Sequence, residues 1–323
     1  MPTSTEPDSA ELASAVPIRE VSRVTGVNSV TLRAWERRYG LLKPLRTDKG
    51  HRLYRPEDVA RVEEIQSWLA RGVAVSQVKA LLGRPAPESG LESVPEDGPW
   101  EAFARRLQAA VGSLQGQSLD SLLAEVGSLY PTDIVVDQLL EPQLQALRVP
   151  LQQQRADYGM ATRLAFLEAH LEAYFASALH RLQAANISHK NPRLLLMDVS
   201  RETDSVLPMI LAYSLAVNSN RVDFFGPVPQ SEWVFAVEQL GSEALILYSD
   251  GAPTRYLEQQ RGEVEQRLQV PVWLAGRMTA LCSPSEHPHC LGQTHRDILR
   301  ALNTTDVRTR AEDPLFPGSG VSE

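Results

Sequence analysis

Residues 29–55 read SVTLRAWERRYGLLKPLRTDKGHRLYR. The apolar spacing at the start of this stretch predicts a short helix, because Leu32, Trp35 and Tyr39 fall on one face and can pack on a small core. Three cations fall on the other side of the same helix: Arg33, Arg37 and Arg38. The stretch therefore predicts a helix with one packed face and one basic face.

A basic β-hairpin is predicted directly after this helix. Asn28 or Ser29 can cap the helix start, and Gly40 can end it. Beyond Gly40, an Asp48-Lys49-Gly50 turn can join two short strands into a wing. The cations around that turn are Lys43, Arg46, Lys49, His51, Arg52 and Arg55. A helix and a wing that both present cations are suited to binding phosphate groups, so we expect DNA as the partner.

The flanks of this stretch make the pattern more specific. IREVSRVTGVNSVTLR leads into it and YRPEDVARVEEIQSWLARGVAVSQVKALL ends it, and residues 17–83 together resemble the winged helix-turn-helix of the MerR family of transcription regulators. TLRAWERRYGLL with GHRLY, in place of the more usual paired tyrosines, is similar to the CarH/LitR light-responsive branch and above all to the MlrA-like regulators. The expected DNA contacts are Ser29, Thr31, Arg33, Trp35, Arg37, Arg38, Tyr39, Lys43, Arg46, Lys49, His51, Arg52 and Tyr54.

Charge is distributed unevenly along the chain. Residues 17–83 carry 13 Lys and Arg against 7 Asp and Glu, a local charge of +6, whereas the whole chain has −8 and the remainder therefore −14. A basic head on an acidic body confines DNA contact to one module. A merely solvated basic surface would account for the charge, but not for the agreement among helix caps, wing turn and apolar spacing.

Length and composition bound the remaining possibilities. A chain of 323 residues with 43% hydrophobic content predicts two or three domains of about 100 residues each. No apolar run reaches the roughly 18 residues that span a bilayer, and MPTSTEPDSAELASA lacks the basic and apolar regions of a signal peptide, so we expect a cytoplasmic protein with no membrane partner. Two cysteines make no disulfide framework.

Proline, glycine and acidic residues indicate where the domains end. GRPAPESGLESVPEDGPW would interrupt the long helix through which simpler MerR proteins dimerise, so we expect self-association further along the chain. The predicted segments are a disordered tail (1–16), the winged helix-turn-helix head (17–83), a linker (84–99), a helical bundle (100–190), a Rossmann-like domain (191–280) and a loosely ordered tail (281–323).

The two domains predicted after the linker differ in the spacing of their apolar residues. Apolar residues three and four apart predict the bundle helices WEAFARRLQAAVGSL, SLDSLLAEVGSLY, TDIVVDQLLEPQLQALRV and ATRLAFLEAHLEAYFASALHRLQAA. Short apolar runs then predict strands at 193–199, 221–226, 243–249 and 270–276, with helices near 208–218, 233–240 and 255–268 between them. This alternation predicts a parallel sheet covered on both faces. The fold class expected is thus multidomain α and α/β.

Head, bundle and α/β domain in this order resemble the cobalamin-binding regulators of the CarH type. In that family a histidine of a Gly-Glu-x-His motif after the first strand ligates cobalt. Here the turn reads MDVSRETDSVLP with Thr203 or Asp204 near that position, and no histidine occurs between Lys190 and Glu286. We therefore expect no cofactor. The candidates to fill the space between bundle and sheet are Trp233, Tyr213 and Phe225.

Two further groups of histidines allow two interpretations each. His170 and His180 lie on the last bundle helix, where the CarH-like regulators carry a histidine that meets the cofactor, but we interpret both as packing residues. A late cluster offers thiolates and imidazoles for zinc at a spacing that fits no standard finger, so we expect no metal there: Cys282, His287, His289, Cys290 and His295.

The sequence contains none of the enzyme motifs GxxxxGK[ST], GxGxxG after the first strand, or GxSxG. The prediction is a MerR-family regulator, MlrA-like, that is not an enzyme and binds inverted-repeat promoter DNA as a dimer or larger oligomer. RNA polymerase is the further expected partner, and a regulatory protein or small ligand stays open. The alternatives are a cobalamin-dependent, light-responsive repressor of the CarH type, a cobalamin-dependent methyl-transfer module that carries a DNA-binding head, and an α/β domain that serves only for oligomerisation.

Overall fold

The computed structural model describes residues 14–47, 49–83, 98–185, 192–200, 206–218, 221–251, 255–280 and 289–304. They divide into two compact units, Met1–His170 and Leu171–Glu323, and helix α10 (Met160–Ala185) has residues in both. The predicted tail 1–16 and linker 84–99 lie almost entirely outside the described residues. No helix in the described ranges is long and apolar enough to cross a membrane.

The head has the helices and the wing that its sequence predicts. Its elements are β1 (Val16–Pro17), α2 (Ile18–Thr25), α3 (Ser29–Ala34), the π-helical turn η1 (Trp35–Tyr39), β2 (Leu45–Arg46), β3 (Arg52–Tyr54), α4 (Pro56–Ala70) and α5 (Val75–Val78). Of the two possible caps, Asn28 is the one that acts, since its side chain accepts a hydrogen bond from the Val30 backbone at 2.9 Å. Gly40 ends the helix with φ 59°, a conformation that favours glycine.

The wing has one more strand than predicted. Strands β2 and β3 pair antiparallel, and β1 adds to the other side of β3, with Val16 opposite Tyr54. A two-residue strand ending in proline carries no alternating pattern, so the sequence gives no sign of it. The extra strand ties the start of the head to the wing.

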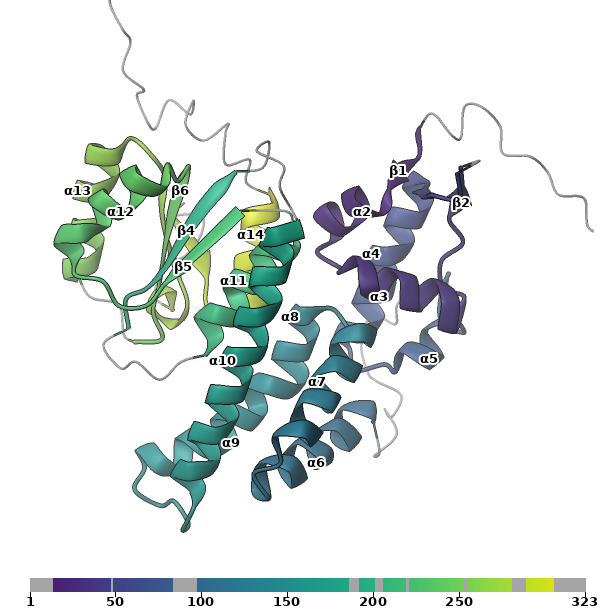
Figure 1. Cartoon of the computed structure of the whole chain (residues 1–323), viewed down its shortest axis with the longest axis horizontal. Helices are drawn as coiled ribbons and strands as arrows, with labels where there is room; N and C mark the ends of the chain where they lie inside the picture. Colours follow the sequence, from purple (N-terminus) through teal and green to yellow (C-terminus); the bar gives the residue numbers. More distant parts are fainter. Residues whose placement is uncertain are drawn as a thin grey trace, which may run out of the picture. The chain divides into compact units, whose positions relative to one another are not determined.

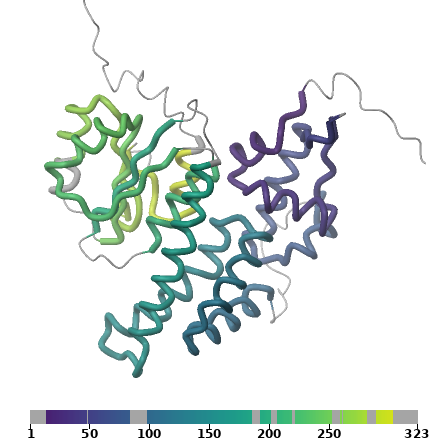
Figure 2. The backbone as a smooth tube through the Cα atoms, viewed as in Figure 1, coloured from purple at the N-terminus to yellow at the C-terminus, as the bar shows by residue number. Residues whose placement is uncertain are grey.

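The bundle contains the four predicted helical stretches. They are α6 (Pro99–Gly112), α7 (Gly116–Leu129), the continuous run α8 (Thr132–Val135), η2 (Val136–Leu140) and α9 (Glu141–Gln152), and α10. Their buried side chains are mainly leucine and valine, such as Leu107, Leu122 and Leu139, as the three- and four-residue spacing requires. Figure 2 follows these helices along the backbone from α6 onward.

The second unit, called the sheet unit below, is built on a parallel sheet of order β5-β4-β6-β7-β8. The strands are β4 (Arg193–Asp198), β5 (Arg221–Phe225), β6 (Ala244–Tyr248), β7 (Val272–Ala275) and β8 (Cys290–Gly292). The helices are α11 (Leu207–Val217), α12 (Trp233–Leu240), α13 (Arg255–Leu268) and α14 (His295–Thr304), with short 3-10 turns η3 (Gln230–Glu232) and η4 (Arg277–Thr279). Helices α12 and α13 cover one face of the sheet, and α11 and α14 cover the other (Figure 1). The predicted doubly wound sheet is confirmed.

The prediction of a loosely ordered tail from residue 281 is wrong for residues 289–304. These residues form β8, which pairs with β7, and α14. His295 of α14 is fully buried, and its Nε2 lies 2.8 Å from the Ser214 hydroxyl of α11. The Pro, Ser and Thr content of the segment concealed a three-residue strand and an amphipathic helix.

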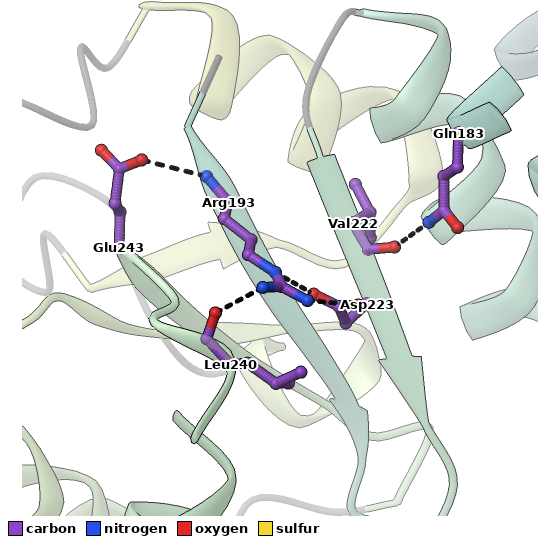
Figure 3. A network of polar contacts seen from close by, with 6 residues as sticks. All are labelled: Gln183, Arg193, Val222, Asp223, Leu240 and Glu243. Atoms are coloured by element: carbon purple, nitrogen blue, oxygen red, sulfur yellow. Dashed lines mark hydrogen bonds and ion pairs between the residues drawn. The ribbon is translucent and has the colours of Figure 1, made fainter. Parts of the chain in front are cut away.

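Arg193 links the amino ends of three strands (Figure 3). Its guanidinium donates to Asp223 of β5 at 2.6 Å and to the Leu240 carbonyl at 2.5 Å. Its backbone exchanges hydrogen bonds with Glu243, which precedes β6. The side chains of Arg193 and Asp223 are each only about a quarter exposed. The network therefore fixes the relative register of β4, β5 and β6 at this end.

Candidate DNA-binding surface

The basic face of the recognition helix, formed by α3 and η1, is open to solvent. Arg33 and Arg37 lie four residues apart and are exposed, as is Arg38. Val30, near the start of the helix, is 52% exposed. Val30 is not among the expected DNA contacts, although its position outside the Leu32 and Trp35 stripe predicts that it faces outward.

The wing presents a second set of cations. Lys43, Arg46, Lys49 and His51 are exposed, whereas Ser29 and Tyr39, at the two ends of the recognition helix, are half-buried. Lys49 and His51 stand at or next to the turn, where Gly50 has φ 79° and so adopts a backbone conformation that L side chains rarely take. The exposed wing cations are the part of the predicted site that can meet a polyanion.

Glu36 of the recognition helix holds two wing arginines. Its carboxylate accepts from Arg46 at 2.9 Å and from both Nε and Nη2 of Arg52. The side chains of Arg52 and Glu36 are each only 14% exposed, and the hydrogen bond from Arg52 to Glu36 is the main reason that the pKa of Arg52 is raised. Arg52 therefore fixes the wing against the helix and has less freedom than Arg46 to move onto a phosphate.

Three of the expected DNA contacts lie in the interior. Thr31, Trp35 and Tyr54 are all 0% exposed. Burial raises the pKa of Tyr54 to about 12, so its hydroxyl stays protonated. The expectation of direct DNA contact is thus corrected for these side chains, because in the described conformation none of them reaches the surface.

Thr31 and Trp35 are buried against the bundle helix α7. Trp35 Nε1 donates to the Leu129 carbonyl at 2.8 Å, and Thr31 Oγ1 donates to the Gly127 carbonyl at 3.2 Å. The carboxyl end of α7 accordingly lies side by side with α3 in both backbone views (Figures 1 and 2). Periodicity indicated that this face of the helix is packed, but not that part of its partner is a bundle helix nearly 100 residues further along.

Residues 16–84 match the family described as MerR HTH family regulatory protein. The chain carries a MerR-type helix-turn-helix domain. The match begins at β1 and ends just after the last described residue of the head, so it includes the recognition helix and the whole wing. The exposed cations described above belong to this domain.

Two curated relatives and one solved structure extend the comparison. The HTH-type transcriptional regulator MlrA of Escherichia coli (strain K12) is 39% identical over 162 residues, which are 50% of this chain and 61% of that protein. The HTH-type transcriptional repressor CarH of Myxococcus xanthus is 32% identical over 133 residues, 39% of this chain and 44% of that protein. The matched segment thus spans less than two thirds of the length of either relative. The methanol:cobalamin methyltransferase complex MtaBC from Methanosarcina barkeri covers 79% of this chain at 15% identity and a TM-score of 0.31, too low to establish a shared fold.

Outside the MerR-type domain, polar groups gather where β4 and β6 end. Asp198 accepts a hydrogen bond from the Ser200 backbone at 2.9 Å, and Asp250 accepts from the Tyr248 hydroxyl at 2.8 Å. Burial is the first cause that raises the pKa of Asp198. In a sheet of this order the switch point lies between these two strands.

The described residues where β4 and β6 end do not include a suitable ligand for cobalt. The groups that it offers are carboxylates and hydroxyls, and the sequence places no histidine between Lys190 and Glu286. Thr203 and Asp204 lie outside the described residues. An imidazole for the lower face of cobalamin is therefore not supplied by the turn after β4.

The three residues expected to fill the space between bundle and sheet, which are Trp233, Tyr213 and Phe225, lie in different places. Trp233 and Phe225 belong to the core between the sheet and helices α12 and α13, with Leu195 and Met197. Tyr213 of α11 instead meets Phe175 of α10, with ring centroids 5.3 Å apart. Trp233 and Phe225 thus fill the core of the sheet unit itself.

Of the two bundle histidines, only one packs as expected. His170 lies against Gly116, where an added Cβ would come within 2.6 Å of its Nε2, and its Nδ1 is 3.0 Å from the Phe166 carbonyl. His180 is exposed, so its interpretation as a packing residue is wrong. Near the end of α10, Gln183 donates a hydrogen bond to the Val222 carbonyl of the edge strand β5 (Figure 3).

The late cysteine and histidine cluster is only partly described. Cys282 and His287 lie outside the described residues, whereas Cys290 is buried in β8 and His295 in α14. Burial lowers the pKa of His295 to about 3, which keeps its ring neutral. Within the described ranges no three His, Cys, Asp or Glu residues stand close enough together to hold a metal ion.

Proposed function

We propose that this protein is a sequence-specific DNA-binding transcription regulator of the MerR type, similar to MlrA, and that it has no enzymatic activity. The observation that carries the proposal is the exposure of Arg33 and Arg37 on a helix whose opposite side is buried, inside a domain that matches the MerR model. Exposed cations on a rigid helix are the groups that enter a major groove.

The exposed residues divide into two roles. Arg33 and Arg37 read base edges, because guanidinium groups pair in bidentate fashion with guanine, and Val30 meets a thymine methyl group. Lys43, Lys49 and the other exposed wing cations bind phosphates and set the register. Glu36 holds the wing at a fixed angle to the helix through Arg52, so both roles act on one stretch of duplex.

Inverted-repeat DNA requires two heads, and we propose that residues 98–304 supply the self-association. Regulation then acts on RNA polymerase at the bound promoter, in the cytoplasm where the chromosome lies. A fragment of residues 98–304 is expected to keep the oligomeric state of the whole chain in light scattering. A monomeric fragment beside a dimeric whole chain would contradict this part of the proposal.

We also propose that the protein acts without cobalamin. The turn after β4 offers no imidazole, so the signal is a partner protein, a different small ligand or the abundance of the protein itself. The competing function is a light-responsive repressor of the CarH type, which is supported by the 32% identity to CarH over part of the chain.

A genome-wide map of bound promoters tests the central proposal. The wild-type chain is expected to occupy a limited set of promoters that share an inverted repeat, whereas the double variant Arg33→Ala/Arg37→Ala loses those peaks at equal protein abundance. A matched double variant on the bundle, Arg105→Ala/Arg155→Ala, removes the same charge from exposed positions and should keep the wild-type map. If all three maps coincide, or if the wild type shows no peaks, the assignment is wrong.

A further inference from the structure

The carboxyl end of α7 completes its hydrogen bonding with side chains of the head. The last four carbonyl groups of a helix have no partner within the helix. In α7 the Val126 carbonyl accepts from the Tyr130 backbone, the Gly127 carbonyl from Thr31 and the Leu129 carbonyl from Trp35. The recognition helix therefore supplies part of the cap of a bundle helix.

The contact leaves the two proposed base readers free. Thr31 and Trp35 are four residues apart and form one stripe of the helix, whereas Arg33 and Arg37 form another. The two capping residues are 0% exposed and the two arginines are exposed in the same conformation. A contact that merely blocked DNA binding would cover the arginines, and this one covers their opposite side.

The end of α7 is itself fixed. Tyr130 stacks within the bundle, its ring centroid 4.6 Å from that of Trp100 and 6.0 Å from that of Phe103. The carbonyls that accept from Thr31 and Trp35 are thus presented from a packed position, not from a fraying helix end.

Glu125 of α7 interacts electrostatically with the third arginine of the recognition helix, Arg38. Glu125 of α7 binds Arg106 at 2.7 Å, and this hydrogen bond is the main reason that the pKa of Glu125 is lowered. The positive charge of Arg38 lowers that pKa further.

From these contacts we infer that the carboxyl end of α7 is a brace that sets the direction of the recognition helix. Thr31 and Trp35 are its positioning residues and act through the helix, without touching DNA. This inference rests on the proposed DNA binding. A helix that loses its brace still carries its cations, so discrimination between sequences falls while non-specific binding persists.

The first test compares binding to two duplexes. One duplex is selected by the wild-type chain from a random-sequence pool, and the other is a scrambled version of it. The variant Thr31→Val/Trp35→Phe removes both donors; the first change keeps the side-chain shape, and the ring volume lost in the second is matched in the control below. Its ratio of affinities for the two duplexes is expected to fall by up to about tenfold, as the loss of one or two hydrogen bonds would allow, with an unchanged salt slope. Thr31→Ser in place of Thr31→Val should recover part of the ratio.

The chain offers a matched control. Trp233 Nε1 donates to the Val228 carbonyl at 3.0 Å and Thr279 Oγ1 to the Gly276 carbonyl at 2.8 Å, both in the sheet unit. Trp233→Phe/Thr279→Val removes two similar bonds and should leave the ratio unchanged. An equal loss in both double variants would show a general effect of stability and would overturn the brace.

Hydrogen exchange of the whole chain separates the brace from direct DNA contact. Without DNA, Thr31→Val/Trp35→Phe should speed amide exchange at residues 126–130, and the selected duplex should slow it in the wild type only. Unchanged exchange in the DNA-free variant would overturn the proposal. Faster exchange on adding duplex would mean that DNA binding breaks the contact, which also overturns it. If the wild type selects no duplex at all, the proposed function fails, while exchange in the free protein still reports on the contact.

Discussion

The head and the sheet unit differ in where the side chains that characterise each of them lie. In the head these are exposed cations, such as Arg33 and Lys49, which add little to the core that holds them. In the sheet unit they are interior residues such as Leu195 and Ile246, which are 0% exposed and define the fold. The difference teaches that the sheet is specified by its own apolar strands, whereas the head is distinguished by its charged surface.

Both regions use an arginine held by a carboxylate, but for different purposes. Arg193 and Asp223 join neighbouring strands of one sheet, so the pair acts within the fold. Arg52 and Glu36 join the wing to the recognition helix, so the pair sets the angle between two surfaces that we propose bind DNA. The predictions that follow probe this contrast between interior and surface.

The largest expected effect is on the interior of the sheet unit. Ile246→Ala in the central strand β6 should lower the free energy of unfolding by about 2–5 kcal/mol, because a buried side chain is lost and a cavity is left. Urea unfolding measures this, with Phe235→Ala as the control because Phe235 is 59% exposed on α12. Weaker binding of DNA by the folded Ile246→Ala protein would contradict the division between interior residues that stabilise the sheet unit and surface residues that bind DNA. An interior residue of the sheet unit would then affect the DNA-binding surface of the head.

A pH dependence is expected from the same unit. The folded pKa of His295 is about 3, below its ordinary value of 6.5, so the unfolded state binds more protons between these values. Stability is therefore lost as pH falls from about 6.5 toward 3, and the loss at pH 5 relative to pH 7 is about 2 kcal/mol. His295→Gln, which keeps a hydrogen-bonding group near Ser214, should flatten this part of the urea-unfolding profile. An equally steep profile in the variant would show that other groups cause it.

On the surface of the head, Arg33→Ala should weaken binding to the selected duplex by about 1–3 kcal/mol and relax the preference at one position of the site. The reason is that Arg33 is proposed to read a base edge. Titration against single-base variants of the duplex measures both quantities. Arg105→Ala, at an exposed position on α6, is the control, and an equal loss in that variant would mean that only total charge matters.

The wing should respond more weakly and more evenly. Arg46 is about half exposed, so Arg46→Ala should cost up to about 1 kcal/mol on every sequence and reduce the salt slope by roughly one. Arg52→Ala should also act evenly across sequences, and because it frees Glu36 it should in addition loosen the wing. Affinities measured over a range of salt concentrations test both variants. A loss confined to one sequence would move either arginine into the group of base readers.

The last prediction is that adenosylcobalamin and light have no effect on the protein. Protein incubated with adenosylcobalamin in the dark should be colourless after desalting, and illumination should change neither its oligomeric state nor its DNA binding. The reason is the missing imidazole after β4. Retention of a stoichiometric cobalamin spectrum would restore the interpretation as a CarH-type repressor and would give the sheet unit a ligand.

The sequence predicted the larger elements well because their patterns are long. The runs RLLLMD and ALILY are continuous and apolar, and the observed strands β4 and β6 end within one residue of the predicted ones. Strands β1 and β8, of two and three residues, are too short to carry a period.

The candidate site was predictable in composition but not in arrangement. Periodicity separated Trp35 from Arg33 correctly, since one is buried and the other exposed. It did not reveal that Trp35 meets Leu129, because a pattern within one helix contains no information on a partner so distant in sequence. The pairing of Glu36 with both wing arginines was hidden for the same reason.

Strand β8 has a consequence for how the chain can be cut. Composition suggests ending a fragment at residue 280, before the Pro-rich and Ser-rich stretch, but that cut removes both β8 and α14. It would leave the backbone edge of β7 unpaired and open to a second molecule, and it would take His295 away from Ser214. A fragment intended for crystallisation or for ligand screening should therefore extend to about residue 304, and aggregation of the shorter form would be a product of the cut and not a property of the protein.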